Sequence, residues 1–144
     1  MSVGSEVYAE GGNYRVIIGT DGVVHFRVWR RPDVSREVGA SYAKEMVGVF
    51  ELLTMEPWMR VRGVVFDLAE ATTTWGPVTQ AAIGEMFSKM EKAGRWLAVV
   101  TAPEAIQLMT VSNVLKKYAP RCGRAFGSLS NGQTWAGQRK RLGG

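Results

Sequence analysis

An acid and a run of three hydroxyl side chains lie close together near the middle of the chain. The acid is Asp67, and the hydroxyls belong to Thr72, Thr73 and Thr74. A carboxylate beside hydroxyls could support proton transfer. The hydroxyls could also cap the start of a helix, or one of them could accept a phosphate, whose charge of about −2 would switch a binding surface. The next residue, Trp75, is either packed over the core or presented as an interface anchor.

These residues follow a short apolar run and precede a helical pattern. Residues 64–66 are apolar without interruption, as in a strand that is covered on both faces. Gly76 and Pro77 then open a helix, whose first turn suits proline because the missing N–H has no partner there. In open α/β sheets, ligands and partners bind at the carboxyl ends of the central strands. We therefore expect Asp67, the threonines, Trp75 and Gly76 to be displayed at one rim of the sheet.

Apolar periodicity predicts a regular order of strands and helices around this segment. Residues 14–18 and 23–29 have the pattern of a β-hairpin. An amphipathic helix is expected from about residue 34 to 55, with Asp33 or Ser35 as its cap. Later strands are expected at 95–100 and 124–128. Later helices are expected from Pro77 to a stop at Gly94, after Thr101 and over 130–140. The buried side of the helix after Thr101 is expected to carry Ile106, Leu108, Met109, Val111, Leu115 and Tyr118.

This order predicts an α/β fold in a single domain. Helices between successive strands imply a mixed, mostly parallel sheet with an N-terminal antiparallel hairpin and about four helices. Residues 1–13 are rich in Gly and polar residues and are expected to be a flexible lead-in. The domain is expected to cover residues 14–140, and residues 141–144 form a C-terminal tail.

The element order and several segments resemble the STAS domain of bacterial anti-sigma factor antagonists, the SpoIIAA-like fold. The family has a central strand that ends in Asp, a short loop with a phosphorylatable Ser or Thr, a Gly and then a helix. The matching segments here are VVFDL and ATTTWG, followed by GRWLAVVTAPEAIQLMTVSNVLKKYAP and RAFGSLSNGQTWAG, and the resemblance spans Tyr14 to Gln138. The family's loop usually reads Asp-Ser-Ser-Gly. In this chain the nearest register has Thr73-Thr74-Trp75-Gly76, so the preceding Asp is absent and Trp replaces a small residue.

Composition bounds the class of protein. The chain has 144 residues, a formal charge of +5 and one cysteine, Cys122, so an intrachain disulfide is excluded and a reducing cytoplasm is expected. No apolar run approaches the roughly 20 residues that span a bilayer, so membrane insertion is not expected. The basic excess could attract an anionic partner. Aromatic residues do not alternate with the basic ones as single-strand binding requires, so nucleic acid is not expected as a partner.

Other reactive residues are isolated in the sequence. Asp67 and Glu70 could form a carboxylate pair, or Asp67 could cap the loop while Glu70 is solvated. His25 lies within a predicted strand and is interpreted as a surface or partly packed residue. Arginines near Cys122 could lower its thiol pKa, although a small buried filler is the commoner role. One Cys and one His cannot form a usual zinc site, and no glycine-rich nucleotide motif follows a strand. No metal or cofactor is expected.

The leading hypothesis is a non-enzymatic bacterial cytoplasmic protein-interaction domain of signalling. It would dock a regulatory partner through the loop Ala69–Gly76 and be switched by phosphorylation of a Thr. The resemblance implies that the partner is an anti-sigma-type kinase or another signalling component.

Two alternatives come from other classes of function. A carrier of a small apolar ligand or lipid could use the methionines at positions 46, 86, 90 and 109 to line a flexible pocket. A cavity of about 300 Å³ or more would favour this carrier. An enzyme would instead use Asp67 and the Thr hydroxyls, and would need a cleft there that excludes water.

Overall fold

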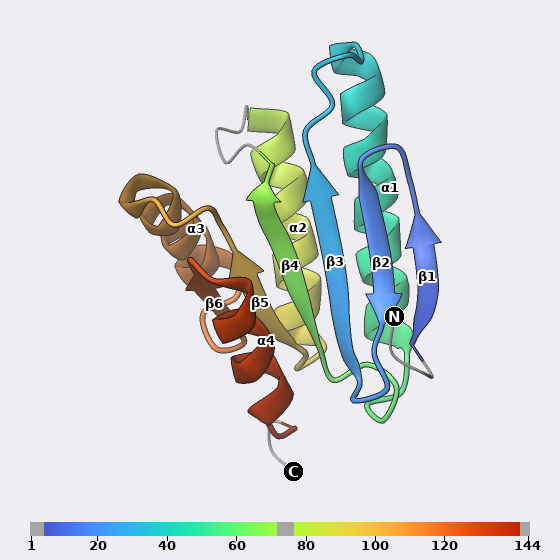
Figure 1. Cartoon of the computed structure of the whole chain (residues 1–144), viewed down its shortest axis with the longest axis vertical. Coiled ribbons are helices and arrows are strands. Elements are labelled where there is room, and N and C mark those ends of the chain that lie inside the picture. Colours follow the sequence, from blue (N-terminus) through green and yellow to red (C-terminus); the bar gives the residue numbers. More distant parts are fainter. Residues whose placement is uncertain (1–4, 72–76, 142–144) are drawn as a thin grey trace.

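A computed structural model of the chain describes residues 5–71 and 77–141. Six strands form one sheet in the order β1-β2-β3-β4-β5-β6, so neighbours in the sequence are also neighbours in the sheet (Figure 1). The strands are β1 (Glu6–Glu10), β2 (Tyr14–Ile18), β3 (Val23–Trp29), β4 (Gly63–Glu70), β5 (Trp96–Val100) and β6 (Gly123–Phe126). The helices are α1 (Arg36–Met55), α2 (Pro77–Lys92), α3 (Ala105–Tyr118) and α4 (Leu129–Gln138).

The sheet is mixed, as predicted. β1, β2 and β3 pair antiparallel, whereas β3, β4, β5 and β6 pair parallel. Each parallel pair needs a crossover, and the helices α1, α2 and α3 supply the three connections. The α/β class, the antiparallel N-terminal hairpin and the parallel remainder are confirmed.

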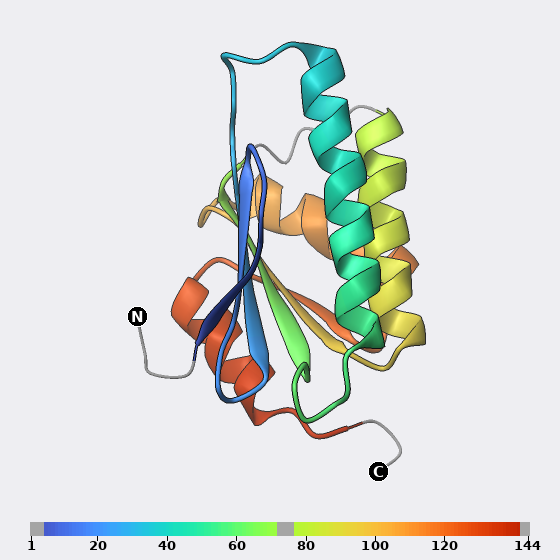
Figure 2. The same ribbon diagram turned by 90° about the vertical axis from the view of Figure 1, so that its right-hand side faces the viewer.

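Helices cover the two faces of the sheet unequally. The helices α1 and α2 stand side by side on one face, and α4 lies on the opposite face (Figure 2). Side chains alternate along a strand, so β4 sends Val64, Phe66 and Leu68 into the large core beneath α1 and α2. Val65 points the other way and packs with Ala136 of α4. The two faces of the central strand therefore pack in two separate clusters.

A chain of phenylalanine rings fills the large core. Phe26 contacts Phe50 and Phe66 with ring centroids 4.8 and 5.4 Å apart, and Phe66 contacts Phe87 at 6.0 Å. Edge-to-face ring pairs contribute about 0.5–1.5 kcal/mol beyond the burial of their area. They fix the height of α1 and α2 on the sheet.

Local signals set the ends of the two helices that pack together. The hydroxyl of Ser35 accepts a hydrogen bond from the Val38 N–H and caps α1, so of the two predicted caps, Asp33 and Ser35, the serine is used. Gly94 follows α2 with φ of 67°, a left-handed conformation that favours glycine and stops the helix as predicted.

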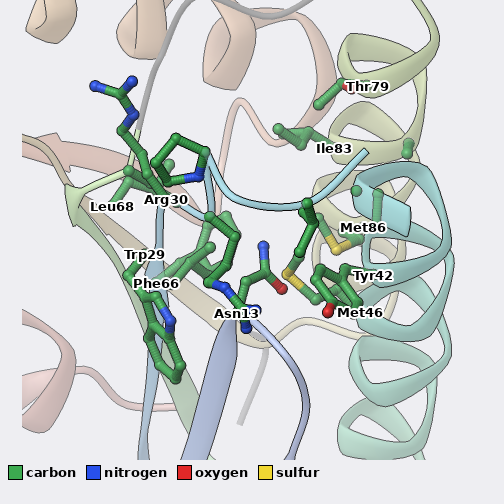
Figure 3. A pocket seen from close by; sticks show the side chains of 18 residues that line it. Asn13, Trp29, Arg30, Tyr42, Met46, Phe66, Leu68, Thr79, Ile83 and Met86 are labelled. Carbon is green, nitrogen blue, oxygen red and sulfur yellow. The ribbon is translucent and has the colours of Figure 1, made fainter. Parts of the chain in front are cut away.

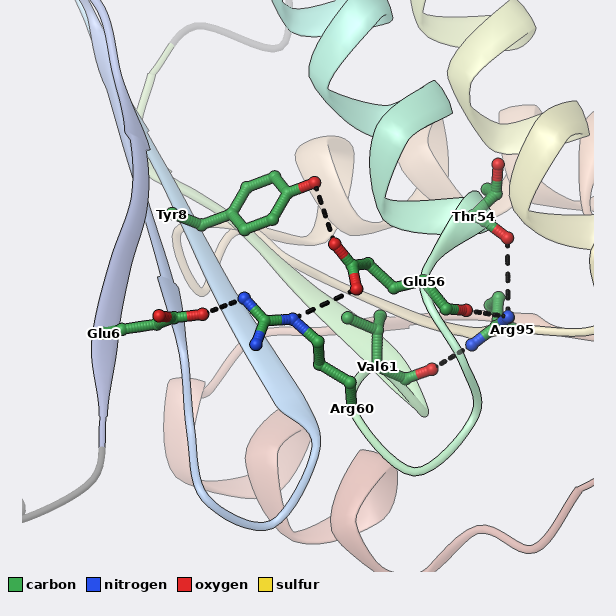
Figure 4. Close-up of polar contacts among 7 residues, drawn as sticks. All are labelled: Glu6, Tyr8, Thr54, Glu56, Arg60, Val61 and Arg95. Carbon is green, nitrogen blue, oxygen red and sulfur yellow. Dashed lines mark hydrogen bonds and ion pairs between the residues drawn. The ribbon is translucent and has the colours of Figure 1, made fainter.

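The strand β1 was not predicted, because residues 6–10 fell within the expected lead-in. It pairs with the neighbouring strand β2, and further contacts come from distant parts of the chain (Figure 4). Arg60 forms ion pairs with Glu6 of β1 and with Glu56, the latter at 3.1 Å, and the Tyr8 hydroxyl donates to Glu56 at 3.4 Å. The local pattern of residues 6–10 carries no sign of these contacts.

Arg95, which immediately precedes β5, caps the carboxyl end of α1. Its guanidinium donates to the carbonyl oxygens of Val61, of Glu56 at 2.5 Å and of Thr54 at 3.4 Å (Figure 4). The last turn of α1 contains no basic residue, so Arg95 supplies from outside the positive charge that a helix C-terminus favours.

The helix α3 differs from its prediction at the amino end. It begins at Ala105 rather than after Thr101, whose hydroxyl donates instead to the Ala102 carbonyl at 2.8 Å. Ile106 and Met109 were expected to be buried, but they are 74% and 60% exposed, while Val111 is fully buried. Only the second half of the apolar stripe lies against the sheet and α2.

Candidate functional site

The predicted position of Phe66 and Asp67 in the middle of the sheet is confirmed. Both lie in β4, which has β3 on one side and β5 on the other. The strand continues to Glu70 and so carries the chain to the rim. The predicted site residues Thr72, Thr73, Thr74, Trp75 and Gly76 lie outside the described residues.

Asp67 is held in place by two hydrogen bonds. Its Oδ1 accepts from the Ala69 N–H at 3.1 Å, and its Oδ2 lies 3.2 Å from Nε2 of His25. Its side chain is only 11% exposed. Burial alone would raise the pKa of the Asp67 carboxyl, but the bonds from His25 and Ala69 outweigh it and hold the pKa below its ordinary value. The Asp67 carboxylate is thus held in a fixed position, and its ionised form is favoured.

Sequence reasoning interpreted His25 as a surface or partly packed strand residue and did not link it to Asp67. The parallel pairing of β3 with β4 brings the two side chains together. His25 is opposite Val65 in the register, so Asp67 is its diagonal neighbour on the same face. The separation of 42 residues along the chain hid this contact. Strand register, rather than any motif, would have been needed to find it.

The second predicted carboxylate, Glu70, has a different partner. Its Oε2 accepts from Nη2 of Arg27 at 2.5 Å, and the Arg27 guanidinium also lies over the Trp29 ring, 5.6 Å from its centroid. The Glu70 side chain is 58% exposed, in line with the alternative of a solvated group. Asp67 and Glu70 are each engaged by a basic side chain of β3 rather than by each other.

A cavity of about 300 Å³ lies on the other face of β4, between the sheet and the amino-terminal halves of α1 and α2 (Figure 3). We call it the α1–α2 cavity. Most of its lining is apolar: Val28, Trp29, Pro32, Val34, Gly39, Ala43, Met46, Phe66, Leu68, Ala71, Ala82, Ile83 and Met86. Native interiors rarely leave gaps much larger than a water molecule. A space of this size is therefore a feature to explain.

Small residues cause the gap. Gly39 and Ala43 are four residues apart and so share one face of α1, and Ala82 lines the cavity from α2. Met46 and Met86 close the cavity below them, one turn further along each helix (Figure 3). Two of the four methionines named as candidate lining residues thus line it. Met90 is instead fully buried in the core, and Met109 is exposed on α3.

Five polar residues interrupt the apolar lining. They are Asn13, Arg30, Arg31, Tyr42 and Thr79, and none of the described lining residues is acidic. Arg31 is occupied: it forms two hydrogen bonds of 2.9 Å to the Asp33 carboxylate and one of 2.6 Å to the Gly12 carbonyl. The guanidinium of Arg30 points away from the cavity (Figure 3). Neither arginine is thus positioned to neutralise an anion inside it.

Sequence reasoning placed the site at Asp67 and missed the opposite face of the same strand. Phe66 and Leu68 line the cavity, while Asp67 between them faces away from it. One signal was present: Gly39 and Ala43 interrupt the apolar stripe of α1 between larger residues. A small residue in such a stripe is compatible both with close packing of two helices and with an open space between them. The sequence alone therefore did not predict the cavity.

The remaining reactive residues do not form a second site. Cys122 is fully buried, and burial, together with the nearby Glu91 carboxylate, raises the pKa of its thiol to about 11. Its interpretation as a buried filler is confirmed. Within residues 5–71 and 77–141, no three His, Cys, Asp or Glu side chains converge as metal ligands would. No helix in those ranges has the length and apolar character required to cross a bilayer.

Comparison with known proteins gives no family assignment. The sequence matches no protein-family model and no curated protein. The resemblance to the STAS domain stays a hypothesis that rests on the quoted segments.

Proposed function

We propose that this chain is a non-enzymatic bacterial cytoplasmic domain that holds a small apolar ligand in the α1–α2 cavity. The observation that carries the proposal is the cavity itself, with its volume of about 300 Å³ and its mostly apolar lining. That size is at the lower end of the range of small-molecule sites, which are mostly apolar with a few polar groups. From the sequence, a cavity of about 300 Å³ or more was the observation expected to favour a carrier.

The chemistry of the lining also favours binding over catalysis. Asp67, the most deeply buried carboxylate of β4, faces away from the cavity and is engaged by His25 and Ala69. Met46 and Met86 offer flexible, polarizable surface that adapts to the shape of a ligand. The described lining residues therefore supply apolar contact and include no activated nucleophile or base.

Methionine methyl resonances test this proposal directly. The protein, labelled with ¹³C at the methionine methyl groups, is titrated with 1-methylnaphthalene. We expect saturable shifts at Met46 and Met86, which line the cavity, and no shift at Met55 and Met59, which are exposed at the opposite end of the molecule. Uniform small shifts at all four, without saturation, would remove the proposal.

A second candidate function is docking of a signalling protein through the loop Ala69–Gly76, in the manner that the STAS resemblance implies. One observation favours it. Val78 in the first turn of α2 is 78% exposed, and Ile106 in the first turn of α3 is 74% exposed. Apolar side chains at helix starts near the end of β4 are suited to an interface. The first turn of α2 contains no acidic residue, so a phosphate on Thr73 or Thr74 would meet no repulsion there.

Affinity capture from the native host distinguishes docking from ligand carriage. A specific partner should be retained by the wild type and lost by a variant with alanine at Thr73, Thr74 and Trp75. It should also be lost when Val78 is replaced by Ser, whereas Met59→Ser is the control at the far end. If every variant still retains the partner, the docking hypothesis is wrong. If Thr73→Glu leaves capture of the partner unchanged, the hypothesis of a phosphorylation switch is wrong.

A further inference from the structure

Exposed apolar side chains gather at the end of the molecule that is remote from the α1–α2 cavity. Met55 is the last residue of α1 and is 76% exposed, and Met59 in the following turn is 87% exposed. The N–H groups of residues 60 and 61 both donate to the Pro57 carbonyl, so this turn is tight and holds Trp58 and Met59 in place. Single exposed apolar side chains are ordinary, but neighbouring ones with polar groups around them mark an interaction site.

Basic side chains lie beside this turn. The Arg95 guanidinium, which caps α1, lies 5.8 Å from the centroid of the Trp58 ring. The Trp96 Nε1–H donates to the Lys140 carbonyl at 2.9 Å, so the segment after α4 runs along the same end of the sheet (Figure 2). Burial lowers the pKa of Arg95, and the positive charge of Arg141 lowers it further, which shows that the two guanidinium groups are near each other. We call the following residues the Met59 patch: Met55, Trp58, Met59, Arg95, Lys140 and Arg141.

The positive charge of the Met59 patch is not neutralised within the protein. Arg95, Lys140 and Arg141 form no ion pair with any described residue. The carboxylate of Glu56, which follows α1 directly, is already paired with Arg60 at 3.1 Å. Cationic groups and exposed apolar groups therefore lie together at one end of the molecule.

This combination restricts the partner. A second copy of the chain would bring two sets of these basic groups together, and each chain already has a formal charge of +5. A nucleic acid offers phosphates, but it has no apolar phase that could accept Met55 and Met59. The surface of an anionic bilayer supplies both. Its phosphates attract Lys and Arg, its acyl chains accept apolar side chains, and tryptophan favours the boundary between the two regions.

We infer that the Met59 patch binds the surface of a membrane that contains anionic phospholipid. Met55 and Met59 enter the boundary of the acyl chains, and Lys140 and Arg141 contact lipid phosphates. The contact is peripheral, so the protein lies on the bilayer rather than across it. The inference is independent of the proposed ligand, because the cavity lies between the sheet and the opposite halves of α1 and α2.

Flotation of the full chain with lipid vesicles tests the inference. Vesicles of equimolar phosphatidylcholine and phosphatidylglycerol should retain the protein, and vesicles of phosphatidylcholine alone should not. Salt should weaken the binding because it screens the charges. Met59→Ser should bind the anionic vesicles about tenfold more weakly, because an apolar contact is lost. The control is Met109→Ser on α3, which replaces a methionine that is 60% exposed and should leave binding unchanged.

A matched pair of double variants tests the basic residues. Lys140→Gln combined with Arg141→Gln should weaken binding to anionic vesicles about 25-fold, or about fivefold for each charge. The control is Arg36→Gln combined with Lys44→Gln, which removes the same charge from exposed positions of α1 outside the patch. Its affinity should stay within about threefold of the wild type, because screened charges far from the surface contribute little. Circular dichroism verifies that each variant is folded.

Methionine methyl resonances locate the contact on the protein. In nanodiscs of the anionic composition, a spin-labelled lipid should broaden the signals of Met55 and Met59 more than those of Met86 and Met109. The inference is wrong if neutral and anionic vesicles bind equally or not at all, or if the patch variants behave like their controls. It is also wrong if the patch binds a single-stranded oligonucleotide and not the vesicles. Each of these results leaves the ligand-binding proposal intact, because that proposal is tested at Met46 and Met86.

Discussion

Gly39→Leu should both stabilise the protein and block the α1–α2 cavity. Gly39 lies in α1 and lines the cavity, and a Cβ built there would meet no other atom within 4 Å. Gly48 is the matched control, because it lies in the same helix, also has open space around a built Cβ and does not line the cavity. The two substitutions differ only in where the new side chain goes.

The expected energies follow from the two environments. Replacing Gly by Leu within a helix gains about 0.5–1 kcal/mol at either position. At Gly39 the side chain also leaves water, which adds about 1–2 kcal/mol. Gly39→Leu should therefore stabilise by about 2 kcal/mol and raise the melting temperature by about 4–8 °C, against about 2 °C for Gly48→Leu. The new side chain excludes about three carbon atoms of a ligand, at about 0.8 kcal/mol each, so 1-methylnaphthalene should bind about 60-fold more weakly.

Urea denaturation followed by circular dichroism gives the stabilities, and calorimetry gives the affinities. The reasoning is refuted if Gly39→Leu and Gly48→Leu bind 1-methylnaphthalene equally well, or if Gly39→Leu destabilises the protein. The first result would mean that this ligand binds elsewhere. The second would mean that the cavity is already closed in solution.

Three further predictions concern the framework around the cavity. Arg95→Met should lower the free energy of unfolding by about 2–4 kcal/mol, because three carbonyl groups lose a charged hydrogen-bond donor. The control is Arg124→Met, which replaces an exposed arginine. A loss below about 1 kcal/mol for Arg95→Met would contradict the role of Arg95 in capping α1. The pKa of Asp67 is lower in the folded protein than in the unfolded chain, so ionised Asp67 stabilises the fold above the unfolded pKa of about 4, and this stabilisation is lost as the pH falls through the folded pKa. The free energy of unfolding, measured by denaturation at pH 2–6, should therefore fall less with acid in Asp67→Asn than in the wild type. Identical pH profiles of the two proteins would contradict this role of Asp67. Cys122, with its pKa of about 11, should react with a thiol reagent at pH 8 only after unfolding, and rapid labelling of folded protein would disprove its burial.

The sequence predicted the elements that have strong local signals. The hairpin of β2 and β3 and the amphipathic helix α1 have clear periodicity over five or more residues, and their boundaries fall within about two residues of the prediction. The uninterrupted apolar run at residues 64–66 located β4, although that strand continues further, to Glu70. Gly94 and Ser35 act as the expected helix stop and one of the expected helix caps.

The features that were missed depend on contacts between distant residues. The strand β1, which pairs with β2, has its side-chain partners in Arg60 and Glu56. The contact of His25 with Asp67 follows from the register of β3 on β4. The cavity arises because Gly39, Ala43 and Ala82 leave a space that no side chain of the described residues fills. Periodicity shows which face of a helix is apolar. It does not show whether two apolar faces meet without a gap.

The most direct measurement of the central claim is the analysis of what the protein carries in its native host. Tagged wild-type, Gly39→Leu and Gly48→Leu proteins are purified without detergent, extracted with organic solvent, and the extracts are quantified by mass spectrometry relative to protein. The account predicts one small apolar molecule, enriched in the wild-type and Gly48→Leu extracts and strongly depleted from that of Gly39→Leu. Three extracts with the same content would contradict the assignment of the α1–α2 cavity as a ligand site.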